Sequence, residues 1–454
     1  MGKRAHKSLE LDGAAPRYLG PRRRRLLRYM AIGFLLTFIL TLSELWFEHS
    51  TVAGSEFRRT GYRLIQHRLS STLDEPSTAD TGVPSLPVTV VDISDLELET
   101  APGTDSKVTP RPELQRILEI IGAQNPSTIG IDIDFSPDEK GWIDPNGDPQ
   151  FFDVCLNLKG PDGHHIPVYL GVNRALTLGP AFWLGNERYE ALAASMIVPR
   201  GGETRAMITE LQVPNSRPLP SLAARLAEAY RGQQPAPFWA RAGESLKLLD
   251  SSSQPDLKGA PVKITEALID YGPRTRFQQE KISYQRLQSL GTAETEARFS
   301  GKMVVIGAAE LGKTADVFSV MGEEPTPGPI VIACAAYTLA QTAPLYELTD
   351  AGHIVINLGL SLVVFLLVGG LWYSHPGKKF AGERVRVACT LLVATAALLV
   401  GVMSVRHTRV VWDGFLIVLI ALAFHSRFDL FVDWLLEILD GDKYRLKRRK
   451  RIST

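Results

Sequence analysis

Four long apolar runs interrupt an otherwise mixed pattern of polar and hydrophobic positions. They cover residues 26–47, 354–372, 387–405 and 410–428. About 20 apolar residues suffice to cross the hydrocarbon core of a bilayer as a helix. The pattern therefore predicts four transmembrane helices. A cleaved signal peptide is the alternative interpretation of the first run. The run is longer than the apolar region of such a peptide, which favours an uncleaved signal anchor.

Charge is divided unevenly along the chain. Residues 48–349 contain 27 Lys and Arg against 38 Asp and Glu, whereas the other residues contain 23 basic and 11 acidic side chains. Basic segments that flank spans stay on the cytoplasmic side. We therefore expect the basic residues 1–25, the loop with Lys378 and Lys379, and residues 429–454 inside. This orientation predicts a multi-pass protein of a bacterial inner membrane, with both termini in the cytoplasm and residues 48–349 extracytoplasmic.

Short apolar runs alternate with amphipathic stretches within residues 48–349. A stalk helix is expected within residues 50–80. The runs predict strands at 87–93, 128–135, 167–172, 267–271 and 302–306, and the amphipathic or apolar stretches predict helices at 112–122, 221–230 and 330–339. A strand, a helix of about ten residues and a second strand form a βαβ unit with a parallel sheet. The predicted fold class is an extracytoplasmic α/β domain, a mostly parallel sheet with crossover helices, plus four transmembrane helices.

Several short motifs occur in an ordered series along this domain. They are Val90–Asp95, Pro110–Arg111 before a helix, Gly130–Phe135, Leu219–Ala223, Ile269–Tyr271, Ser300–Gly307, Asp316–Phe318 and Pro327–Gly328. In this order and spacing, over about residues 30 to 375, they resemble the CHASE sensory domain family, type two.

The resemblance implies an extracellular or periplasmic sensor, followed by three spans and a cytoplasmic output domain. Residues 429–454 are too few for a catalytic domain. We therefore expect a receptor that passes its signal to a separately encoded cytoplasmic effector, and not an enzyme, since neither a Ser-His-Asp signature nor a zinc motif is evident. The alternative is a structural or assembly subunit of an envelope complex.

Carboxylates follow the predicted strands at their carboxyl ends, where parallel sheets bind ligands. Asp92 ends the first strand, Asp132 and Asp134 end the second, and Asp316 follows a third. Arg111 precedes the first crossover helix. We expect these five residues to form a ligand site, with helix and turn capping as the alternative.

The run Gly307 to Thr314 matches the phosphate-loop pattern after a strand. Against this interpretation, Gly322 and three neighbouring Gly and Pro residues follow too soon for the required helix, and Glu310 would place a carboxylate in the phosphate cradle. No strand ending in a magnesium-binding Asp follows. We interpret the match as an ordinary strand-to-loop turn.

An acidic stripe on the helix after the last span is expected to bind a partner. Asp429, Asp433 and Glu437 recur every four residues. A helix that lies on the membrane with a basic tail is the alternative. Besides the lipid bilayer, the expected partners are an unknown extracytoplasmic ligand and the effector, with a homodimer left open. No cofactor, metal or nucleic acid is expected, and Cys155 and Cys334 are interpreted as two buried thiols, with a disulfide as the alternative.

Overall fold

The structure, a computed structural model, describes residues 86–100, 107–136, 147–172, 187–196, 206–212, 219–232, 244–248, 261–313, 316–320, 324–340 and 346–347, with short or single positions between 31 and 64, at 144 and 183, and between 352 and 411. The chain divides into two compact units. One comprises Met1–Phe57, Thr349–Leu399 and Gly414–Thr454, and the other comprises Arg58–Leu348 and Val400–Asp413. The α/β domain lies in the second unit.

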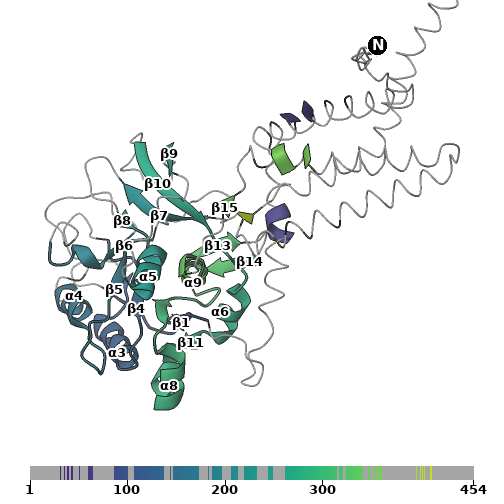
Figure 1. The fold of residues 1–454 in the computed structure, drawn as a ribbon. Coiled ribbons are helices and arrows are strands. Elements are labelled where there is room, and N and C mark those ends of the chain that lie inside the picture. The colour runs from purple at the N-terminus through teal and green to yellow at the C-terminus, as the bar shows by residue number, and fades with distance from the viewer. Residues whose placement is uncertain are drawn as a thin grey trace, which may run out of the picture. The chain divides into compact units, whose positions relative to one another are not determined.

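A six-stranded sheet forms the centre of this domain (Figure 1). Its order is β11-β1-β12-β4-β5-β6, and all neighbouring strands run parallel. The strands are β1 (Val88–Asp92), β4 (Thr128–Asp132), β5 (Val168–Val172), β6 (Ala193–Ser195), β11 (Ile282–Ser283) and β12 (Met303–Gly307). The prediction of a mostly parallel sheet is confirmed.

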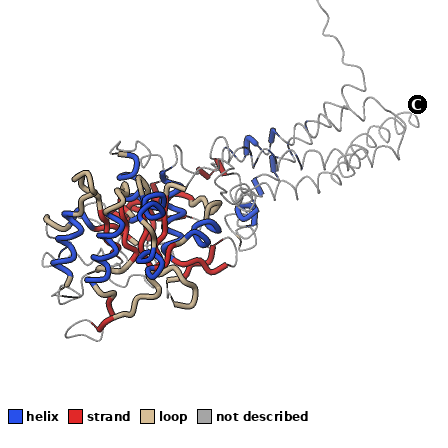
Figure 2. The backbone as a smooth tube through the Cα atoms, turned by 90° about the horizontal axis from the view of Figure 1, so that it is seen from below, coloured by secondary structure: helices blue, strands red, loops and turns tan. Residues whose placement is uncertain are grey.

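Helices cover both faces of the sheet, as the tube in Figure 2 shows. One face packs against α3 (Arg111–Gly122), α4 (Asp148–Asn157), α7 (Tyr284–Ser289) and α8 (Thr292–Phe299). The other packs against α5 (Leu222–Arg231), α6 (Arg274–Glu280) and α9 (Gly328–Ala340). Side chains of one strand alternate between the two cores, because successive β-carbons point to opposite faces: Val304 enters the first core and Val305 the second.

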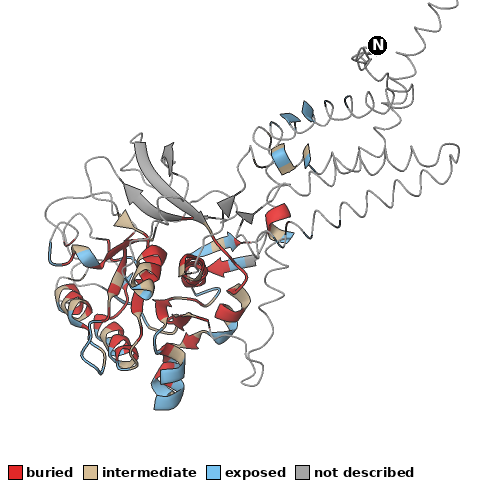
Figure 3. Ribbon diagram, viewed as in Figure 1, coloured by how far each residue is buried: buried red, intermediate tan, exposed pale blue. Residues whose placement is uncertain are grey.

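The local sequence explains where these helices begin and how deeply they are buried. The hydroxyl of Ser221 accepts a hydrogen bond from the N–H of Ala224 at 3.2 Å and caps α5. Pro112 lies in the first turn of α3, where its missing N–H costs nothing. Helix α9 is apolar on all sides and almost wholly buried (Figure 3), as expected for the run at 330–339.

A second sheet was not anticipated from the sequence. It is antiparallel, with the order β8-β7-β10-β9, and contains β7 (Ala206–Gln212), β8 (Leu219–Pro220), β9 (Glu244–Leu248) and β10 (Pro261–Leu268). The predicted strand at 267–271 is therefore wrong in extent, because β10 ends at Leu268, and β10 belongs to this antiparallel sheet. Ile269 and Tyr271 follow β10 and are buried in the core with α9, so their apolar signal reports burial and not strand structure.

Short elements complete the described fold. They are the 3₁₀ turn η2 (Glu190–Leu192) and the two-stranded pairs β2 (Glu99–Thr100) with β3 (Lys107–Val108), β13 (Val317–Val320) with β14 (Glu324–Pro327), and β15 (Tyr346–Glu347) with β16 (Val410–Val411). Val410 and Val411 begin the predicted fourth span, and they form a strand.

The predicted spans fall largely outside the described residues. Positions described within the first three are helical, for example Leu35, Ile39, Val355 and Leu399. Within the described part of the chain, no helix has both the length and the hydropathy needed to cross a bilayer.

The two thiols of the domain lie in different cores. Cys155 is buried among the residues of the first core and Cys334 among those of the second. Both are free, so the interpretation as buried thiols is confirmed and the disulfide alternative is wrong.

Candidate functional site

Two aspartates flank one glycine at the carboxyl edge of the sheet. Strand register places Asp92 of β1 beside Gly307 of β12, and Gly307 beside Asp132 of β4. Val90 of β1 and Val305 of β12 enter the core with α9, so positions two residues further along the strands face the same side of the sheet. Two of the predicted site residues, Asp92 and Asp132, therefore lie in one row at the carboxyl edge of the sheet.

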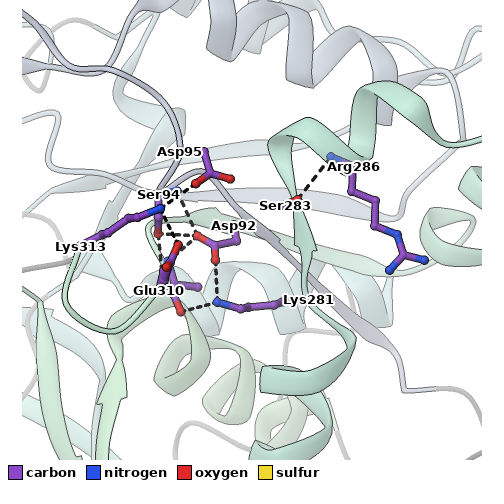
Figure 4. A network of polar contacts seen from close by, with 9 residues as sticks. Asp92, Ser94, Asp95, Lys281, Ser283, Arg286, Glu310 and Lys313 are labelled. Carbon is purple, nitrogen blue, oxygen red and sulfur yellow. Dashed lines mark hydrogen bonds and ion pairs between the residues drawn. The ribbon is translucent and has the colours of Figure 1, made fainter.

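Asp92 is held by a dense set of donors (Figure 4). Lys281 Nζ donates to Asp92 Oδ2 at 2.6 Å and to the carbonyl of Ala309 at 2.8 Å. Asp92 Oδ1 accepts from the backbone N–H of Ala309 at 2.9 Å, and from the N–H and hydroxyl of Ser94 at 3.0 and 2.5 Å. Burial alone would raise the pKa of Asp92, but these hydrogen bonds, led by Lys281, outweigh it, and the pKa is lowered. Asp92 is an ionised, fully engaged carboxylate.

Further contacts beside Asp92 hold two loops together. The N–H of Glu310 donates to the hydroxyl of Ser94 at 2.9 Å. Lys313 Nζ lies 2.8 Å from Asp95 Oδ1 and 2.8 Å from Glu310 Oε2. The loop after β12 is thereby tied to the loop after β1, as Figure 4 shows.

This loop is the segment that matches the phosphate-loop pattern. Gly312 has a φ of +90°, and β12 is followed by a turn and then by β13, with no helix in the described residues between them. Lys313, which would have to reach a phosphate, is committed to two carboxylates that raise its pKa. The structure agrees with a strand-to-loop turn.

Asp132 has a contrasting environment. It is buried, with 9% of its surface exposed, and its Oδ1 has no hydrogen-bond partner in the described part of the chain. Burial, and then the nearby carboxylate of Asp316, raise its pKa well above the ordinary value. An unpaired carboxyl at such a site is costly and is a recognised mark of function.

Asp316 approaches Asp132 at the first residue of α9. A β-carbon on Gly328 would lie 2.4 Å from Asp316 Oδ2 and 3.1 Å from Asp132 Oδ2. The N–H of Gly328 donates to the carbonyl of Asp316 at 3.0 Å. The two carboxylates therefore converge on one point, which only a glycine leaves open.

The other two predicted site residues do not join them. Arg111 is buried on the opposite face of the sheet, where its Nε donates to Asp148 Oδ1 at 2.6 Å and its guanidinium lies 4.5 Å from the ring centre of Phe135. Asp134 is exposed, and its Oδ1 accepts from the N–H of Ser136 at 2.9 Å. Arg111 ties α3 to α4, and Asp134 closes a turn.

One peptide group, between Ile269 and Asp270, connects α9 with Tyr62. The hydroxyl of Tyr62, in the predicted stalk, donates to the carbonyl of Ile269 at 2.5 Å. The N–H of the next residue, Asp270, donates to the hydroxyl of Thr338 at 2.8 Å, and this hydroxyl donates to the carbonyl of Cys334 at 2.7 Å. Tyr62 is fully buried, so the helical residues 60–64 are held next to the carboxyl-terminal half of α9.

The remaining residues are the predicted partner-binding stripe, a lysine that was not predicted, and possible metal ligands. Asp429, Asp433 and Glu437 lie outside the described residues. Sequence reasoning missed Lys281, which follows a short helix and carries no motif. Among the residues that the structure describes, no group of three or more His, Cys, Asp and Glu side chains is arranged to hold a metal.

The fold and site together define an α/β domain with a polar edge at the carboxyl ends of its parallel strands. The sequence matches the CHASE2 domain family over residues 37–371. The chain therefore belongs to the CHASE2 domain family, whose members are extracellular sensory domains. Comparison with curated proteins and with solved structures gives no match.

Proposed function

We propose that this protein is a membrane-bound receptor of a bacterial inner membrane. Its α/β domain binds a ligand outside the cytoplasm, at the edge formed by Asp132, Asp316 and the first turn of α9. The bound state is passed to a separately encoded cytoplasmic effector. Family membership supports the sensory role, and the contact between α9 and the stalk supports the route of the signal.

Helix α9 carries the argument for transmission. Its first residue, Gly328, lies between the two carboxylates, and Thr338 in its last turns holds the peptide bond that Tyr62 also holds. A 13-residue helix is about 20 Å long and moves as one body. A shift of α9 on ligand binding therefore displaces the peptide between Ile269 and Asp270, and with it the stalk. Such coupling is worth about 1–3 kcal/mol.

Exposed apolar side chains support the membrane assignment. Large hydrophobic residues in the predicted spans are exposed, with Trp46 at 67%, Val355 at 69% and Leu399 at 57%. These residues are helical. Apolar side chains that face outward from helices are what a bilayer requires and what water disfavours.

Topology reporters test the predicted orientation. A reporter fused after Tyr230 should be active only outside the cytoplasm, and one fused after Thr454 only inside. The reverse pattern would remove the extracytoplasmic ligand from the proposal.

A second experiment tests the signal itself. Tyr62→Phe removes one hydroxyl and keeps the buried ring, so the domain should fold and insert while its output weakens. Asp429→Lys with Asp433→Lys should prevent capture of a cytoplasmic effector from cells, with Lys447→Glu as a charge-change control on the tail. A chain that captures envelope proteins equally in all variants, and no effector, would instead be an assembly subunit.

A further inference from the structure

We propose that the strand pair β15–β16 is the joint through which the α/β domain moves the start of the fourth apolar run. The pair joins Tyr346–Glu347, which follow α9, to Val410–Val411, which begin that run. The joint gives the proposed receptor a route from its outer domain to its cytoplasmic helix. Its biological role rests on the proposed function, whereas the mechanical coupling is a property of the described residues.

Backbone pairing is the first support. Tyr346 pairs with Val410 and Glu347 pairs with Val411, and the two strands run parallel. Parallel strands cannot be joined by a tight turn and need a long crossover connection. Here the crossover consists of residues 348–409, which contain the second and third apolar runs. The pair therefore unites two segments that are distant in the sequence.

The direction of the pair agrees with the predicted topology. Residues 354–372 and 410–428 are both expected to cross the membrane from outside to inside. The first of these runs begins shortly after β15, and the second begins with β16. Two chains that enter a membrane side by side in the same direction run parallel where they enter. An antiparallel pair would direct one of the two chains back toward the domain.

The start of the fourth run belongs to the same compact unit as the α/β domain. Val400–Asp413 groups with Arg58–Leu348, whereas the neighbouring segments Thr349–Leu399 and Gly414–Thr454 belong to the other unit. Strand β15 also lies next to β10, which pairs with β7 and β9 in the antiparallel sheet (Figure 1). The fourth run is therefore attached to the domain by backbone pairing beside a sheet.

Two connections lead from α9 to this joint. Residues 341–345 join α9 to β15 along the chain. Strand β10 ends at Leu268, and just beyond it the N–H of Asp270 donates to the hydroxyl of Thr338 in α9 at 2.8 Å. A displacement of α9 therefore reaches β15 directly and through the end of β10. Because β16 pairs with β15, the start of the fourth run moves with it.

The small size of the pair is consistent with a switch. An isolated two-stranded pair is marginally stable at best in water. A pair of two residues on each strand therefore depends on β10 and on the segments that lead into it. Such a contact has two discrete states, formed and broken, and a small shift of its supports exchanges them. The fourth run then continues along the chain to residues 429–454, where the partner-binding stripe is expected.

Paired cysteines test the register in the full chain in native membranes. Neighbouring strands lie about 4.8 Å apart, within the Cα separation that a disulfide spans. Tyr346→Cys with Val410→Cys, and Glu347→Cys with Val411→Cys, should each form a disulfide within one chain on oxidation. Tyr346→Cys with Val411→Cys is the matched control and should not, because successive side chains of a strand point to opposite faces. All variants carry Cys389→Ala, which removes the thiol of the third apolar run.

A protease site inserted after Lys379 makes the bond visible. Cleavage there leaves two fragments, which remain together without reductant only where the disulfide has formed. Equal cross-linking of the control pair, or none of either matched pair, would overturn the joint.

Amide hydrogen exchange of the full chain in detergent tests the coupling without any ligand or effector. Thr338→Val keeps the shape of a buried side chain and removes the hydroxyl that accepts from Asp270. Exchange in peptides that cover residues 400–413 should become about fivefold faster, the factor that corresponds to one lost hydrogen bond. Ser221→Ala removes a buried hydroxyl at the start of α5 and should leave these peptides unchanged. Unchanged exchange at 400–413 in Thr338→Val, or equal acceleration in Ser221→Ala, would overturn the coupling.

A flexible insertion separates the joint from the proposed function. Gly-Ser-Gly-Ser placed between Val411 and Trp412 keeps the pair and loosens its connection to the fourth run. With insertion confirmed by the reporter after Thr454, this variant should lose its cellular output. The same insertion after Gly163, in an exposed turn, should keep it. If the first variant responds normally, β15–β16 is only an anchor and the receptor stands. If even the unmodified chain has no output, the receptor proposal fails, while the disulfide and exchange results decide the coupling by themselves.

Discussion

Asp92 and Asp132 are the same residue type in the same row of one sheet, separated only by Gly307. Asp92 accepts from Lys281, Ser94 and Ala309, whereas Asp132 Oδ1 accepts from no group in the described chain. Position at a sheet edge therefore does not by itself determine a carboxylate's role. The loops that lie beside it decide whether a carboxylate receives several donors, as Asp92 does, or none at one oxygen, as at Asp132 Oδ1 in the described chain.

The donors at each carboxylate come from different parts of the sequence. Lys281 precedes the edge strand β11, and Ala309 follows β12, so the Asp92 corner joins segments that are distant in the chain. At the Asp132 corner the arriving segments bring a second carboxylate and a glycine. Opposite charges meet at the Asp92 corner, whereas two carboxylates approach each other at the Asp132 corner.

The largest predicted effect is a loss of stability when Asp92 is substituted. Asp92→Asn leaves the ammonium of Lys281 half-buried without its counter-charge, since the Lys281 side chain is 27% exposed. We expect a loss of about 3 kcal/mol in the free energy of unfolding, the lower end for breaking a buried pair. Denaturant unfolding of the full chain in detergent measures it. Asp153→Asn, which breaks an exposed pair with Arg188, should cost less than about 1 kcal/mol.

The same substitution at the Asp132 corner should have the opposite sign. Asp132→Asn removes a buried carboxyl whose raised pKa in the folded protein costs stability at neutral pH, and we expect the free energy of unfolding to rise by about 1 kcal/mol. Thermal unfolding of the full chain at neutral pH measures this gain. A loss of stability would show that Asp132 has a structural partner.

A smaller effect appears in the pH dependence of Asp92. Its pKa is lowered in the folded protein from the ordinary value of 3.8. A carboxylate with a lowered folded pKa stabilises the protein above its unfolded pKa, and this contribution is lost as the pH falls through the folded pKa. The difference in the free energy of unfolding between the unmodified chain and Asp92→Asn should therefore be constant from pH 7 to about 5. Below about pH 4 this difference should become smaller. A gap that widens in acid would contradict the assigned ion pair.

Sequence reasoning found the sheet edge for a definite reason. Asp92 and Asp132 each end an apolar run, and parallel strands end at a common edge, so their proximity follows from pattern and topology alone. Helix α9 was likewise predictable, because an apolar run with no polar face must be buried.

The other site residues depended on information that no pattern carries. Arg111 was expected at the same edge, but the crossover places α3 on the opposite face, and a sequence does not state which face a helix covers. Ile269 and Tyr271 extended the apparent strand signal because they are buried in the core with α9, although β10 ends at Leu268. Contacts such as Tyr62 with Ile269 join residues 207 positions apart, so local periodicity contains no trace of them.

The smallest predicted effect concerns the loop that resembles a phosphate loop. Lys313 is exposed and lies between Asp95 and Glu310. Pairs at an exposed lysine contribute little, because water screens them and long side chains lose entropy. Lys313→Ala should therefore leave the unfolding midpoint unchanged within replicate error.

The full chain should also fail to bind or hydrolyse ATP, because Lys313 is paired with two carboxylates and a β-strand, not a helix, follows the turn. Calorimetry with ATP and Mg²⁺ tests this. Micromolar binding that disappears in Lys313→Ala would show that the loop rearranges to bind phosphate. The contacts between the loops after β1 and β12 would then have to break.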